Sequence, residues 1–100
     1  MAPLNRQKAA PLSAGYDRVA DVLYVTLGSA IPDVGEDAPR GIILRYSMAN
    51  DQPTGATVVG LFHNHWDREI DGLAKRLGDH LKASPSDIGE AIRSAVKEDK

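Results

Sequence analysis

The chain has 100 residues, a formal net charge of −2 and no cysteine. This length suits one domain with one modest core, and the lack of cysteine excludes disulfides, thiolate metal sites and a cysteine nucleophile. The small negative charge argues against general binding to nucleic acid, which requires clustered Lys and Arg. Because no apolar run approaches the roughly 20 residues of a membrane span and no secretory signal is visible, we expect a cytoplasmic protein without membrane association.

Residues 1–15, MAPLNRQKAAPLSAG, combine two prolines and many small residues without an apolar period. Such a composition at a chain end is typical of a flexible arm. We therefore expect order to begin near Tyr16 and residues 16–100 to form a single domain.

Three segments are rich in β-branched and apolar residues: 21–27 (DVLYVTL), 41–47 (GIILRYS) and 56–63 (ATVVGLFH). This enrichment predicts strands, and a short piece at 14–17 would add a fourth. Residues 29–41 contain two prolines and two glycines, which predicts a loop with solvated acids. Since strands with short connections usually pair antiparallel in sequence order, we predict a small antiparallel β-meander of three or four strands within residues 16–63.

Two helices should follow, at residues 67–82 and 85–97. In the first, an apolar stripe at helical spacing runs through Ile70, Leu73, Ala74, Leu77 and Leu81. The second begins with a clear start signal, because Ser84 can cap, Pro85 suits the first helical position and Asp87 completes a capping box. Strands first and helices last define an α+β fold.

Between the strands and the helices lies HNHWD, residues 63–67. If residues 63–65 continue an extended strand, His63 and His65 share one face. Asp67 would then supply a third ligand, and two imidazoles with a carboxylate suit zinc or a similar divalent metal.

A purely structural interpretation accounts for the same five residues equally well. Asn64 and Asp67 are both good N-cap residues, and either can accept hydrogen bonds from the first turn of the next helix. Trp66 can pack against Ile70 or Leu73 and fix the direction in which that helix begins. The histidines would then be ordinary boundary residues. The sequence leaves both interpretations open.

The stretch YDRVADVLYVTL (16–27) carries Tyr16, Asp17 and Asp21 followed by Leu23 and Tyr24. This pattern resembles the opening signature of the DUF2283 family, small bacterial proteins of unknown function. The segments GIILRY (41–46) and VVG (58–60) are similar to later parts of that family. The resemblance implies a small β-meander domain with no established activity and, for some relatives, an antitoxin-like or other partner-binding role; it does not reach HNHWD.

Two functions remain as hypotheses. The first is a non-enzymatic module that binds protein partners, including itself, without any cofactor, because no paired catalytic constellation occurs. In this case we expect a homodimer or higher even-numbered homo-oligomer that uses a strand edge, the 85–97 helix, or both. The alternative is a metal-dependent enzyme with a divalent metal such as zinc at His63, His65 and Asp67.

Overall fold

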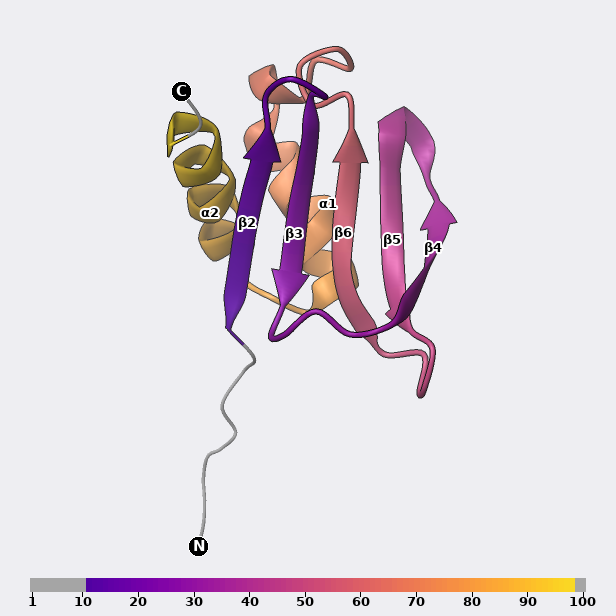
Figure 1. Cartoon of the computed structure of the whole chain (residues 1–100). Helices are drawn as coiled ribbons and strands as arrows, with labels where there is room; N and C mark the ends of the chain where they lie inside the picture. The colour runs from indigo at the N-terminus through magenta and orange to yellow at the C-terminus, as the bar shows by residue number, and fades with distance from the viewer. Residues whose placement is uncertain (1–10, 99–100) are drawn as a thin grey trace, which may run out of the picture.

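The computed structural model describes residues 11–98, which form a five-stranded antiparallel sheet with two helices on one face (Figure 1). Its strands are β2 (Leu12–Asp17), β3 (Val22–Leu27), β4 (Asp33–Asp37), β5 (Ile42–Ser47) and β6 (Pro53–Val59). The helices are α1 (Ile70–Leu81) and α2 (Pro85–Glu98). A short 3-10 turn lies between β4 and β5 (Pro39–Gly41), and another precedes α1 (Trp66–Arg68). The predicted α+β fold, with strands first and helices last, is confirmed, although the sheet has five strands rather than three or four.

The strands lie in the order β2-β3-β6-β5-β4, and every neighbouring pair is antiparallel. Pairing in sequence order holds for β2–β3, β4–β5 and β5–β6, as a meander requires. It fails at β3, which pairs with β6 instead of β4. Leu23 and Val25 of β3 lie opposite Val58 and Ala56 of β6, and all four are fully buried. Burial of these apolar side chains explains why both strands lie in the interior of the sheet, with β6 at its centre.

Strand β4 was predicted to be part of a loop, and this prediction is wrong. The strand is acidic and almost wholly exposed, so it lacks the alternation of apolar residues by which a strand is recognised. Its first residue is held by tertiary contacts: Arg45 donates to the Asp33 carboxylate from Nε (3.1 Å) and Nη2 (2.6 Å), and Thr54 Oγ1 donates at 2.9 Å. Asp33 is therefore an anchor and not a solvated acid.

Strand β2 begins at Leu12, so the predicted arm of residues 1–15 extends four residues too far. Leu12, Ala14 and Tyr16 are partly buried against the core, on the face where α2 packs against β2. This packing adds the strand to the sheet despite the intervening Ser13 and Gly15. The rest of the predicted arm, residues 1–10, lies outside the described residues.

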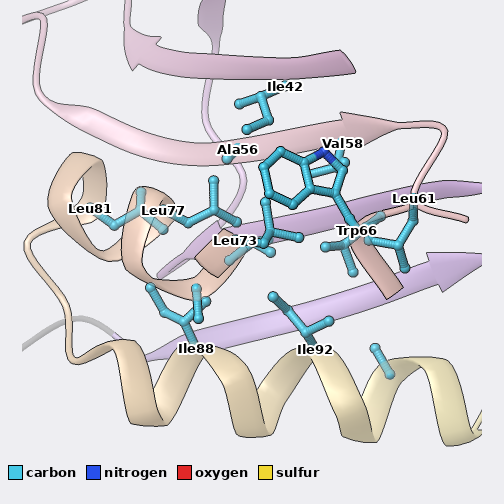
Figure 2. Packing of buried hydrophobic residues seen from close by; sticks show 14 residues of the cluster. Ile42, Ala56, Val58, Leu61, Trp66, Leu73, Leu77, Leu81, Ile88 and Ile92 are labelled. Carbon is cyan, nitrogen blue, oxygen red and sulfur yellow. The ribbon is translucent and has the colours of Figure 1, made fainter. Parts of the chain in front are cut away.

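The core lies between the sheet and the two helices (Figure 2). Both predicted stripes contribute to it: Leu73 and Leu77 of α1 and Ile88 and Ile92 of α2 have no exposed surface. The stripe of α2, which we expected to be available for dimerisation, is therefore used within the chain itself. Any self-association needs another surface.

The helix boundaries follow the predicted signals closely. Helix α2 begins at Pro85, and the Asp87 N–H donates to Ser84 Oγ over 3.4 Å, which is a long cap hydrogen bond. Helix α1 begins at Ile70, three residues later than predicted, because Trp66–Arg68 forms a separate 3-10 turn. None of the helices in residues 11–98 is long and apolar enough to cross a membrane.

Candidate functional site

The HNHWD segment lies in a turn and not on a strand. Strand β6 ends at Val59, four residues before the predicted end at His63, and Gly60 adopts a φ of 84° that ends the extended conformation. The Gly60 N–H donates to the backbone oxygen of Asp21 over 2.7 Å, and residues 60–65 then turn toward the helices. The extended backbone that would place His63 and His65 on one face is therefore absent from this segment.

The three predicted metal ligands are held in different ways. His63 is exposed and is anchored by its backbone N–H, while His65 is exposed in the left-handed region with a φ of 66°. Asp67 is half-buried in the 3-10 turn that follows. Across residues 11–98, no three His, Cys, Asp or Glu side chains are placed so that they could hold a metal ion. The structure does not bring His63, His65 and Asp67 together as one ligand set.

Three other side chains give this turn a structural role, but not by the predicted capping, because neither Asn64 nor Asp67 caps α1, whose N-cap Glu69 has no side-chain cap hydrogen bond. Asn64 Nδ2 donates to the Val59 carbonyl over 3.0 Å, which ties the turn to the end of β6. Trp66 is buried in the core, and its indole Nε1 donates to the Arg40 carbonyl over 2.9 Å. Arg40 in turn donates from Nη2 to the Asn64 carbonyl (2.7 Å) and from Nη1 to Glu69 (2.9 Å).

The Arg40 guanidinium also lies over the Trp66 ring, with its central carbon 3.6 Å from the ring centroid. A cation–π contact at a partly exposed site contributes about 0.5–1 kcal/mol. The turn thus joins the sheet to the helical layer through one arginine and one tryptophan. The role of Arg40 could not be predicted from local patterns, because its partners lie 24 to 29 residues away in the sequence.

Asp21 fastens the same turn from the other side. Its carboxylate accepts hydrogen bonds from the Tyr16 hydroxyl (2.7 Å) and from the backbone N–H groups of Phe62 (3.0 Å) and His63 (3.0 Å). Burial, the largest single influence, raises the pKa of the Asp21 carboxyl, but these hydrogen bonds together lower the pKa below its ordinary value. The spacing of Tyr16 and Asp21 in the sequence therefore has a structural explanation.

Asp17 has a local role in the β2–β3 turn. Its Oδ1 accepts a hydrogen bond from the Ala20 backbone N–H over 3.1 Å, which is a common arrangement for an aspartate at a tight turn. Asp17 and Asp21 thus both stabilise turns.

The sheet face opposite the helices is uncovered in the described part of the chain (Figure 1). On it Tyr24 of β3 and Val59 of β6 are 48% and 46% exposed, and Thr57 of β6 lies opposite Tyr24. A hollow of about 330 Å³ lies on this face beside the Asp33–Arg45 ion pair. Among residues 11–98, these two are the charged residues that line the hollow, and their charges neutralise one another, so this lining has no net charge with which to attract an ion.

The two edges of the sheet differ in their chemistry. In antiparallel pairs, successive residues direct their backbone N–H and C=O groups alternately toward and away from a given neighbour. The Gly28 N–H donates to the Pro11 carbonyl across β2–β3, so odd-numbered residues face inward and the backbone groups of Leu12 and Ala14 face outward. The Ala38 N–H donates to the Ile42 carbonyl across β4–β5, so Asp33, Gly35 and Asp37 face outward on β4.

Comparison of the chain with protein-family models, curated proteins and solved structures found no match. The resemblance to the DUF2283 family therefore stays a prediction. A function for the chain is therefore proposed from the contacts, burial and charges of residues 11–98.

Proposed function

We propose that the chain is a non-enzymatic protein-binding module and that its binding site is the outer edge of strand β2. The acids within residues 11–98 that have shifted pKa values are Asp21 and Asp33, and both accept several hydrogen bonds that hold turns or strands together. Neither is paired with an activated nucleophile or a second catalytic group. Groups used in this way support a structural role better than acid–base chemistry.

The observation that carries the proposal is the composition of the β2 edge. An edge strand exposes backbone groups that recruit another strand unless charges, prolines or bulges prevent it. Residues 12–16 (LSAGY) contain neither charge nor proline. Within the described residues, the outward backbone groups of Leu12 and Ala14 have no hydrogen-bond partner.

Strand β4 shows how the same sheet protects its other edge. Three of its five residues, Asp33, Glu36 and Asp37, are acids, and Pro39 follows two residues after its end. Acids along an edge repel a second acidic strand and discourage pairing. The contrast supports β2 as the edge that is kept open for binding by strand addition.

A peptide copy of residues 11–18 (PLSAGYDR) tests this site. We expect it to shift the amide signals of Leu12 and Ala14 in the 15N-labelled chain and to leave those of β4 unchanged. The matched control is the same peptide with an N-methyl group on its alanine, which removes one backbone donor and should weaken the effect. Equal shifts from both peptides, or no shift in β2, would contradict the proposal.

A further inference from the structure

We infer that the strand added to β2 is the β2 strand of a second copy of this chain, related by a two-fold axis. This inference rests on the proposed function of the β2 edge, and it names the partner. The supporting observation is that β2 is self-complementary in backbone direction, side chains and charge, whereas β4 is not.

The register of such a pair follows from the alternation of the strand. Residues opposite one another in an antiparallel pair lie on the same face of the sheet. In a two-fold pair, the numbers of two opposed residues must therefore have an even sum. The registers that overlap most place the axis at Ala14, with Ser13 opposite Gly15, or at Gly15, with Ser13 opposite Asp17.

Neither register of β2 opposes like charges. With the axis at Ala14, Leu12 lies opposite Tyr16 of the second copy on the helix-bearing face, which is an apolar–aromatic pair. On the open face, Ser13 and Gly15 are small, and a side chain added at Gly15 would meet nothing within 4 Å. The second strand therefore meets no obstruction from Gly15 or from charge.

The corresponding pairing of β4 is disfavoured. Its fullest overlap places the axis at Gly35, so Asp37 of each copy lies opposite Asp33 of the other, whose charge is balanced only within its own ion pair with Arg45. Moving the axis to Glu36 opposes two glutamates. Like charges directly opposite one another destabilise a strand pair, and this asymmetry selects β2.

Helix α2 would lie next to the second copy in such a pair. It packs against β2 (Figure 1), and Arg93 on one side of it reaches Asp71 of α1 over 2.7 Å. On a helix, Ala91 lies about 160° around the axis from Arg93, and Ser94 also lies away from the buried stripe. Asp87 and Glu98 share this side of α2 with the small Ala91 and Ser94, so a second α2 packs against the small residues and leaves these acids in solvent when two β2 strands pair.

Because the chain contains no cysteine, single cysteines can report the pair. Residues opposite one another in a non-hydrogen-bonded pair have Cα atoms about 4.5 Å apart, which suits a disulfide. With the axis at Ala14, Ser13→Cys and Gly15→Cys should cross-link under mild oxidation only when the two variants are mixed. With the axis at Gly15, Gly15→Cys should cross-link alone. Val34→Cys on β4 is the control and should not cross-link.

Charge provides a second, reversible test. With the axis at Ala14, S13D/G15D creates two opposed carboxylate pairs, and the dimer should weaken by about five- to thirtyfold. S13K/G15D changes the same two positions but opposes Lys to Asp, and should dimerise like the wild type. Equal weakening in both variants would mean that the substitutions act on the fold and not on strand pairing, which overturns the inference for this register.

The decisive readout is the mass in light scattering at about 100 µM, where a dimer with a micromolar Kd is largely assembled. We expect twice the 10.8 kDa of one chain, with a cross-link at β2. A monomer whose β2 still binds the 11–18 peptide would overturn the inference that the partner is a second copy, while leaving the proposed edge site intact. A monomer that does not bind the peptide would overturn both the edge site and the second-copy inference. A dimer without a β2 cross-link would show that the interface lies elsewhere, which overturns the inference.

Discussion

Replacing Asp21 by asparagine is the sharpest test of the structural role assigned to the Asp21 carboxylate. Asp21 has a φ of 59°, and asparagine tolerates this left-handed conformation better than most residues. The substitution keeps the shape and one acceptor oxygen but removes the charge. Its new amide also faces the backbone N–H groups of Phe62 and His63, so a donor opposes a donor.

The size of the effect follows from the three hydrogen bonds to the carboxylate. A hydrogen bond to a charged group contributes about 1.5–3 kcal/mol. Asp21 is only partly buried, and water can replace part of what is lost. We therefore expect Asp21→Asn to lower the free energy of unfolding by about 2 kcal/mol at pH 7, a large share of the stability of a 100-residue domain.

The pH dependence gives the prediction a second, independent part. The pKa of Asp21 is lowered in the folded chain, so its contribution is complete above the unfolded pKa of about 3.9 and is lost as pH falls through the folded pKa. The difference in stability between wild type and Asp21→Asn should stay constant from pH 7 to about 5 and then close at lower pH. Asp33 also has a lowered pKa, but it is present in both proteins and cancels in the difference.

Urea denaturation at a series of pH values measures this difference. Tyr16→Phe in both backgrounds completes a double-mutant cycle and isolates the hydrogen bond from the Tyr16 hydroxyl. Equal stability of Asp21→Asn and the wild type at pH 7, or a difference that does not change with pH, would refute the structural role of this carboxylate.

Three further predictions concern the helices and the histidines. Ser84→Ala should lower stability in urea by about 0.5–1 kcal/mol, because the N-terminus of α2 loses a long cap hydrogen bond; no change would mean that the cap contributes nothing. Ile92→Asp should unfold the chain in circular dichroism, since it places a charge at a fully buried position; a folded monomer would contradict this. His63→Ala/His65→Ala should bind zinc as the wild type does in calorimetry, and a loss of tight binding would restore the metal hypothesis.

The helices could be predicted because their signals are local. The apolar period and the Ser84–Pro85 start depend on residues within a few turns of one another, and α2 begins where that signal indicates. Strand β4 could not be predicted in this way. It is an acidic edge strand whose position depends on contacts between Asp33 and partners 12 and 21 residues away.

The HNHWD segment shows the same limit at the candidate site. Its apolar run suggested that the strand continues to His63, but Gly60 and the backbone hydrogen bonds to Asp21 end it at Val59. The side-chain hydrogen bonds between Asp21 and this turn span 41 and 42 residues. No periodicity in the sequence reports contacts across that distance. The alternative role as a joint between sheet and helix could nevertheless be predicted from Trp66, although Asn64 and Asp67 do not cap α1 as the sequence suggested.

Amide hydrogen exchange of β2 at low and high protein concentration tests the central claim most directly. The outward N–H groups of Leu12 and Ala14 should exchange rapidly in dilute solution and become protected as concentration rises, because a second strand accepts their hydrogen bonds. The inward N–H groups of Ser13 and Gly15 should be protected at both concentrations. Exchange of Leu12 and Ala14 that is equally fast at every concentration would contradict pairing at this edge.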